Sequence, residues 1–188
     1  MKNKIGCFIP SRTSSSRLPN KALVLVRNKP VIQHIIERAK LVASADIIVL
    51  CTTTDKSDDA LAAIAEANGV EVFRGSPIDV AARFLKAADQ LGVYAFSVFS
   101  GDNVFTDPDI INQGINQLIT QRLDFINIPD QLLVSGAGCY CISVAALRRV
   151  CQTKNFTDTE YLRECFRDRE QFKVQDLKVN DPIFYNPK

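Results

Sequence analysis

Short apolar runs alternate with amphipathic segments along almost all of this 188-residue chain. The runs that predict buried strands cover residues 5–9, 47–51, 70–73, 94–99, 125–128 and 138–142, with an edge strand at 172–177. Segments with apolar residues at helical spacing lie between them, at residues 30–39, 57–69, 78–91, 107–119, 143–151 and 157–166. Strands that alternate with helices predict an α/β fold, in which a mostly parallel sheet carries helices on both faces.

Helix boundaries are marked by capping residues and proline. Pro30 suits the first position of one helix, and Ser57 is expected to cap another. Asp107, Pro108 and Asp109 together have the composition of a helix start. These two aspartates are therefore expected to be structural.

Composition indicates an ordinary globular protein. Hydrophobic residues make up 46% and charged residues 23% of the chain, close to ordinary globular usage. The length of 188 residues predicts a single domain over residues 1–188. The 23 Lys and Arg against 21 Asp and Glu are too balanced for a nucleic-acid or membrane-surface partner. Because no apolar run approaches the roughly 18 residues that span a bilayer, we expect a cytoplasmic protein.

The six cysteines indicate no metal site. None has Cys-x-x-Cys spacing and the chain has one histidine, so zinc binding is not expected. Cys7, Cys51, Cys139 and Cys141 fall within strand-like runs. We expect them to be buried, reduced thiols.

The first loop with a chemically unusual composition follows the first predicted strand. Residues 9–23 read IPSRTSSSRLPNKAL and contain the cations Arg12, Arg17 and Lys21. The serines of this loop are Ser11, Ser14, Ser15 and Ser16. Backbone N–H groups and hydroxyls can wrap a phosphate chain that the cations neutralise, and Pro19 stiffens the segment. A solvated basic turn is the alternative, since the glycines of the dinucleotide and Walker motifs are lacking.

A second loop follows the predicted strand at 94–99. Asp102 comes after Gly101 with no capping role, and one carboxylate together with substrate phosphates can hold Mg²⁺. Arg74 is a candidate near a nucleotide or an exposed strand-end charge. Asp79 is a further candidate near a nucleotide or sugar, although Asp79 and Arg83 have the spacing of a surface ion pair on one helix.

These residues carry a resemblance to the sugar cytidylyltransferases. The pattern Arg-x-x-Ser-x-Arg-Leu-Pro-x-Lys is matched by Arg12, Ser15, Arg17, Leu18, Pro19 and Lys21. The family includes acylneuraminate and 3-deoxy-manno-octulosonate cytidylyltransferases, and the chain is most similar to the spore-coat polysaccharide type. Residues 52–84 and 157–179 continue the likeness. Asp102 matches the metal-binding aspartate that follows glycine in the family.

The resemblance implies a Rossmann-like, GT-A-like nucleotidyltransferase fold with three layers. It implies an enzyme that uses CTP and Mg²⁺ to convert a sugar into a CMP-sugar and pyrophosphate, with a homodimer possible. The residues implied in catalysis are Arg12, Lys21 and Asp102, with Asp102 as metal ligand. The residues implied in nucleotide binding are Pro10, Ser11, Arg12, Ser15, Arg17, Lys21, Arg74 and Ser100.

The chain also departs from the family pattern. Val104 replaces a proline after the metal-binding aspartate, and Asn20 replaces the glycine of the first motif. Family members continue into a second acidic cluster, which is not found before Lys188. The sequence therefore leaves open a shortened enzyme, a catalytically impaired nucleotide-binding relative or partner subunit, and a nucleotidyltransferase that uses another base or a phosphate-bearing acceptor.

Overall fold

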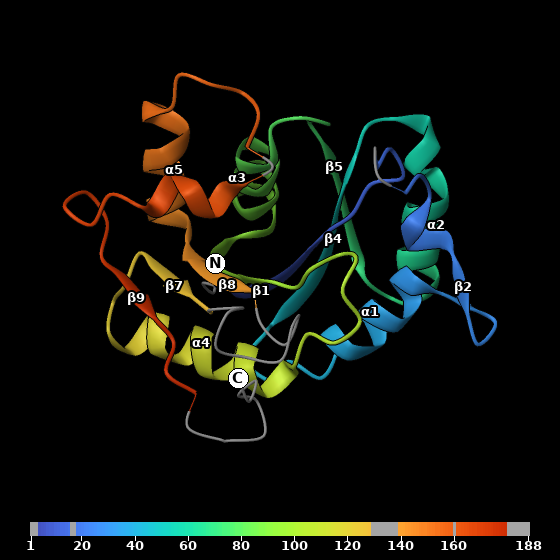
Figure 1. The fold of residues 1–188 in the computed structure, drawn as a ribbon, viewed down its shortest axis with the longest axis horizontal. Helices are drawn as coiled ribbons and strands as arrows, with labels where there is room; N and C mark the ends of the chain where they lie inside the picture. The colour runs from blue at the N-terminus through green and yellow to red at the C-terminus, as the bar shows by residue number, and fades with distance from the viewer. Residues whose placement is uncertain (1–3, 16–17, 129–138, 160, 180–188) are drawn as a thin grey trace.

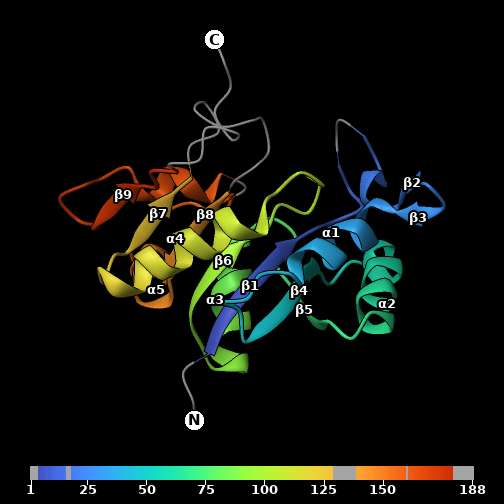
Figure 2. The same cartoon turned by 90° about the horizontal axis from the view of Figure 1, so that it is seen from below.

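The computed structural model describes residues 4–15, 18–128, 139–159 and 161–179. In these residues a seven-stranded sheet has the order β5-β4-β1-β6-β8-β7-β9. Its strands are β1 (Lys4–Pro10), β4 (Ile47–Thr53), β5 (Glu71–Gly75), β6 (Val93–Val98), β7 (Phe125–Asn127), β8 (Tyr140–Ser143) and β9 (Val174–Asp176). A separate hairpin joins β2 (Leu25–Val26) to β3 (Lys29–Pro30) and stands beside the helix α2 (Asp59–Ala67) in Figure 2.

Helices cover both faces of this sheet. They are α1 (Val31–Ala39), α2 (Asp59–Ala67), α3 (Val80–Leu91), α4 (Pro108–Thr120) and α5 (Val144–Thr153). Figure 1 shows α3 and α5 on one side of the strands and α1 and α4 on the other. The apolar residues of α1, α2 and α4 share one buried cluster, whereas those of α3 and α5 belong to a second cluster across the sheet. The predicted three-layer α/β architecture is confirmed.

The sheet is mostly parallel, as predicted. β1 pairs in parallel with β4 and β6, and β4 pairs in parallel with β5. β8 is the exception, because it runs antiparallel to both of its neighbours, β6 and β7. This reversal brings the beginning of β8 to the edge of the sheet where β1 and β6 end.

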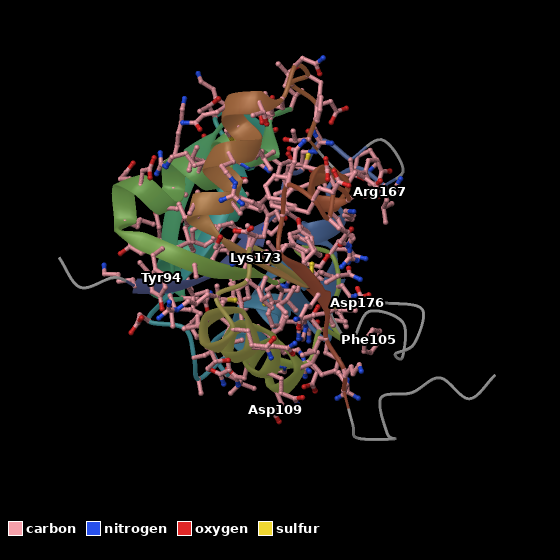
Figure 3. All side chains as sticks on the ribbon, turned by 90° about the vertical axis from the view of Figure 1, so that its left-hand side faces the viewer. Tyr94, Phe105, Asp109, Arg167, Lys173 and Asp176 are labelled. Atoms are coloured by element: carbon pink, nitrogen blue, oxygen red, sulfur yellow. The ribbon has the colours of Figure 1, made fainter. Side chains whose placement is uncertain are left out.

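The predicted edge strand is also present. β9 pairs with β7 alone at the end of the sheet. Figure 3 shows it as the outer strand that faces the viewer, with Lys173 before it and Asp176 at its end.

Two helix predictions were wrong in detail. In this region the structure describes residues 157–159 and 161–166, and among these residues only a 3₁₀ segment, Leu162–Phe166, is helical. Ser57 caps no helix, because a 3₁₀ turn at Lys56–Asp58 precedes α2 and the carboxylate of Asp55 accepts from Ser57 N at 2.9 Å. At α4, Asp107 accepts from the backbone N–H groups of Asp109 and Ile110, which confirms the predicted helix start.

The cysteines in the strand-like runs are buried, as predicted. Burial raises the pKa of the Cys7 thiol to about 12, so this group is neutral at physiological pH. Among the described residues no helix has both the length and the apolar character needed to cross a bilayer.

Candidate functional site

A pocket of about 220 Å³ lies where β1 and β6 end and β8 begins. Ligands of open α/β sheets bind at this edge, beyond the carboxyl ends of parallel strands. The residues around it are Pro10, Ser11, Arg12, Ser15, Lys21, Val80, Arg83, Ser100, Gly101, Asp102 and Tyr140. The two loops singled out by their composition therefore meet in one place, although about 80 residues separate Lys21 from Asp102.

The ends of β1 and β6 approach so closely that only glycine fits at position 101. A Cβ atom there would lie 1.8 Å from the carbonyl oxygen of Pro10. The missing side chain lets the loop that carries Ser100 and Asp102 pack directly on the loop that follows β1. Gly101 thus sets the distance between the two halves of the pocket.

The loop after β1 is folded around Thr13. The Thr13 carbonyl oxygen accepts hydrogen bonds from Ser15 N and Asn20 N, each at 2.9 Å. Its backbone N–H and its hydroxyl both donate to Asp58 Oδ1, at 2.8 and 2.7 Å. Because Asp58 lies at the start of α2, this carboxylate ties the loop to that helix.

Asp58 is buried, with 1% of its surface exposed. Its second oxygen, Oδ2, accepts from the hydroxyls of Thr52 and Thr53. Burial alone would raise the pKa of Asp58, but the hydrogen bonds from Thr53, Thr13 and Thr52 outweigh it and hold the pKa below its usual value. The carboxylate is therefore a charged structural support of the loop.

Asn20 occupies a left-handed backbone position, with φ of 58°. Glycine and asparagine are the residues that adopt this conformation most readily. Replacement of the family's glycine by Asn20 therefore keeps the turn that leads into Lys21.

Lys21 and Asp102 form an ion pair through Nζ and Oδ2. The hydroxyl of Ser100 donates to the other oxygen, Oδ1, at 2.8 Å. The side chains of the pair remain 29% and 44% exposed, so both are accessible from the pocket. The residues predicted to contact phosphate and metal thus face each other.

Arg12 links the loop after β1 to the segment before α3. Its Nη1 donates to the carbonyl oxygen of Pro77 at 3.0 Å. This contact spans 65 positions of sequence. It brings the beginning of α3, with Val80 and Arg83, to the pocket.

The predicted ion pair between Asp79 and Arg83 was wrong. Asp79 caps α3 by accepting from Ala82 N, and it pairs with Lys154. Burial alone would raise the pKa of Asp79, but hydrogen bonds from Lys154, Ala82 and Thr159 hold it below its usual value. Arg83 is 3% exposed and donates through Nη1 to the carbonyl oxygen of Ser76 at 2.8 Å. The four-residue spacing between Asp79 and Arg83 does not reveal that the Arg83 side chain points into the protein rather than toward solvent.

Most of the predicted site residues line this one pocket: Pro10, Ser11, Arg12, Ser15, Lys21, Ser100 and Asp102. Arg17 lies outside the described residues. Arg74 does not line the pocket, because it donates to the carbonyl oxygens of Thr53 and Asp55 and pairs with Asp59.

Sequence reasoning gave no pocket role to Val80, Arg83 and Tyr140. Val80 and Arg83 fall within residues 52–84, so the resemblance of this segment to the family was the available signal for both. Tyr140 reaches the pocket because β8 is reversed, and apolar patterning does not show strand direction.

The donor set around Asp102 fits a hard cation such as Mg²⁺ when substrate phosphates complete the coordination. One carboxylate and the Ser100 hydroxyl supply oxygen atoms. No group of three or more metal-ligating side chains occurs in the part of the chain that the structure describes. Any metal here is therefore expected to bind together with the nucleotide.

Comparison with known proteins agrees with the fold and the site. The chain is 35% identical over 116 residues to the 3-deoxy-manno-octulosonate cytidylyltransferase of Aeromonas salmonicida (strain A449), covering 58% of this chain and 44% of that protein. It is 30% identical over 130 residues to the spore coat polysaccharide biosynthesis protein SpsF of Bacillus subtilis (strain 168), covering 67% and 54%. The chain thus spans about half the length of these curated relatives.

A solved cytidylyltransferase from Leptospira borgpetersenii has the same fold. It superposes with a TM-score of 0.85 and 25% identity over 95% of this chain and 77% of the other. This similarity confirms the predicted nucleotidyltransferase architecture. The model of the cytidylyltransferase family matches residues 7–185. The chain therefore belongs to the cytidylyltransferase family, as its first loop predicted.

Proposed function

We propose that this protein transfers the CMP group of CTP to a hydroxyl of a sugar. In this reaction the sugar oxygen attacks the α-phosphorus, the bond to the leaving pyrophosphate breaks, and the proton of the sugar hydroxyl passes to solvent water. The observation that carries the proposal is the meeting of Lys21, Asp102 and Arg12 in one pocket of a cytidylyltransferase-family fold. The products are a CMP-sugar and pyrophosphate.

The cations of the pocket suit the charge that develops in this reaction. Negative charge builds on the phosphate oxygens and on the leaving pyrophosphate, and cations fixed in advance stabilise it. Arg12, Ser11 and Ser15 bind the triphosphate, and Lys21 lies beside the α-phosphate. Lys21 leaves Asp102 for the phosphate when the nucleotide binds.

We propose that Asp102 is the metal ligand of the protein and that phosphate oxygens of the nucleotide complete the coordination. When bound there, Mg²⁺ supplies Lewis-acid stabilisation of the phosphate oxygens. Ser100 keeps Asp102 oriented through its hydrogen bond to Oδ1.

The relatives suggest the class of sugar. One is named for 3-deoxy-manno-octulosonate and another for spore coat polysaccharide biosynthesis. We propose that the acceptor is an acidic sugar or another sugar of a surface polysaccharide, and that the enzyme acts in the cytoplasm. A homodimer stays a prediction.

The test is pyrophosphate release from CTP and Mg²⁺ with a panel of sugars, with Lys21→Ala and Asp102→Ala beside the wild type. Each substitution is expected to lower turnover by at least about a hundredfold, because each removes a main electrostatic contact. Lys29→Ala is the matched control, since Lys29 pairs with Glu37 away from the pocket. Wild-type turnover in both pocket variants would contradict these assignments. Binding of CTP without any pyrophosphate release would instead support the nucleotide-binding alternative.

A further inference from the structure

Arg38 connects α1 to the loop that carries Asp102. The side chain lies in the last turn of α1, and its Nε and Nη2 both donate to the carbonyl oxygen of Thr106 at 3.1 Å. Arg38 and Thr106 are 68 positions apart in the sequence, and Thr106 stands four residues after Asp102. Figures 1 and 2 both show the segment that leads into α4 next to α1. A helix outside the pocket therefore holds the end of this loop.

The Thr106 carbonyl oxygen depends on this contact. Thr106 has none of its surface exposed and precedes α4, whose first residue is Pro108. Asp107 O, one position later, accepts from Ile111 N at 3.1 Å and belongs to the helical pattern, whereas Thr106 O lies outside it. A buried carbonyl group without a donor is costly, so the guanidinium of Arg38 fixes where Thr106 lies.

The other end of the loop is fixed at the sheet. Gly101 packs against the carbonyl oxygen of Pro10, and Asn103 N donates to Ser100 O at 3.4 Å. Asp102 thus lies between two held points, Gly101 and Thr106. Because its side chain is 44% exposed, packing around the carboxylate does not hold it, and its place follows from the loop backbone.

The same helix supports Lys21. Ala22, the next residue, is 1% exposed and shares a buried cluster with Ile32 and Ile35 of α1. Val31 N, at the start of α1, donates to Val24 O at 2.9 Å, directly after the segment Lys21–Leu23. Helix α1 therefore contacts both of the segments whose side chains form the Lys21–Asp102 ion pair.

We infer that Arg38 is a positioning residue for Asp102. Its two hydrogen bonds to Thr106 keep the loop where Asp102 faces Lys21 in the free protein and a divalent cation in the nucleotide complex. This inference rests on the proposed function. Groups that orient a metal ligand from behind change metal affinity by about 10- to 100-fold when they are removed.

A purely structural role is the alternative. A cation in the last turn of a helix is stabilised by the helix dipole, and Arg38 occupies such a position. Loss of that effect would lower the stability of the protein. It would leave the dependence of nucleotide binding on Mg²⁺ unchanged, and this difference separates the two roles.

The experiment measures CTP binding by calorimetry, once with Mg²⁺ and once with EDTA. The ratio of the two affinities is the magnesium gain. Arg38→Gln should lower the magnesium gain by about tenfold, because the loop no longer presents Asp102 to the cation. Its CTP affinity in EDTA should equal that of the wild type, since Arg38 does not line the pocket.

A double variant tests whether Arg38 acts through Asp102. Asp102→Ala should by itself remove the magnesium gain. Addition of Arg38→Gln to Asp102→Ala should then lower CTP affinity in Mg²⁺ no further, because two changes on one path are not additive.

Two single variants complete the design. Arg38→Lys keeps the charge at the end of α1 but replaces two converging N–H groups by one ammonium, so it should also lower the magnesium gain. It provides the test if Arg38→Gln does not fold. Arg169→Gln is the matched control, because Arg169 Nη1 donates to a backbone carbonyl, Val174 O, at 2.8 Å away from the pocket. This variant should keep the wild-type gain.

The outcomes separate the two proposals. A folded Arg38 variant with the wild-type magnesium gain would overturn the positioning role and leave the proposed function intact. Equal loss of affinity in Mg²⁺ and in EDTA would overturn it too, as would a further loss in the Asp102→Ala background, because Arg38 would then support the pocket as a whole. A wild-type protein that does not bind CTP would overturn the proposed function, and the inference with it.

Discussion

Asn20 shows how one backbone position controls the entry to the pocket. Its N–H bonds to Thr13 O, and its left-handed conformation turns the chain into the 3₁₀ segment Lys21–Leu23. No side-chain cap bond is made by Asn20 at this turn, so the residue acts here through its backbone. The sequence showed Asn20 as a departure from the family, and the structure shows why the departure is tolerated.

Asn20→Gly and Asn20→Val should therefore differ in the size of their effect on stability. Gly adopts positive φ freely and should change the free energy of unfolding by only a few tenths of a kcal/mol. The β-branched Val should cost about 1–3 kcal/mol and displace Lys21, which weakens CTP binding. Thermal melts and CTP titrations measure the two effects.

A control comes from the β2–β3 turn. Asn28 also has positive φ, at 63°, but lies away from the pocket. Asn28→Val should lower stability and leave CTP affinity unchanged. If Asn20→Val binds CTP as well as the wild type does, Asn20 does not position Lys21.

At the scale of elements, the loop after β1 is held by a connection that sequence patterning does not show. Thr13 and Asp58 are 45 positions apart, and nothing in periodicity or composition pairs them. By contrast, strand and helix positions follow from local apolar spacing, and the Asp107 cap follows from local chemistry. The direction of β8 and the inward turn of Arg83 depend on tertiary contacts, so neither was predictable.

Asp58→Asn tests this connection. The variant keeps the shape of the side chain but places an NH₂ group against hydroxyl and N–H donors. We expect a loss of about 2 kcal/mol or more in the free energy of unfolding at neutral pH. Urea unfolding measures it, with Asp109→Asn, an exposed first-turn residue of α4, as control.

The difference in unfolding free energy between the wild type and Asp58→Asn should also depend on pH in the acid range. The folded-state pKa of Asp58 is lowered, so its stabilisation is complete above its unfolded pKa of about 3.9 and is lost as pH falls through the lower folded value. The stability difference between wild type and Asp58→Asn should therefore be constant near neutrality and shrink below about pH 4. A difference that stays unchanged down to pH 2 would show that the charge of Asp58 contributes nothing.

At the scale of the whole molecule, the sheet separates two buried clusters, and the pocket lies at the edge where both end. Phe8 of β1 stacks on Phe96 of β6 with ring centroids 4.4 Å apart, and Phe84 of α3 meets Phe96 at 5.5 Å. The strands β1 and β6, whose ends form the pocket, are thus joined to each other and to α3 through these aromatic rings. A ligand that joins the loops of β1, β6 and α3 should stabilise the entire fold.

CTP with Mg²⁺ at a hundredfold excess over its Kd should stabilise the protein by about 2.7 kcal/mol. For a chain of this length that corresponds to a rise in Tm of roughly 5–10 °C. Differential scanning calorimetry measures the shift, and ATP and GTP at the same concentration serve as controls. Equal shifts with all nucleotides would contradict a cytidine-specific pocket.

Because β8 is reversed, the two sides of the pocket are built by different parts of the sheet. The parallel strands β1 and β6 end in loops that line the pocket, whereas β8, which begins at Tyr140, enters the sheet from the same edge. In the proposed enzyme the nucleotide lies against the loops after β1 and β6, so the acceptor sugar can be recognised on the side where β8 begins. Substitutions around the antiparallel strand β8 can then change which sugar is accepted without altering the loops proposed to bind the nucleotide.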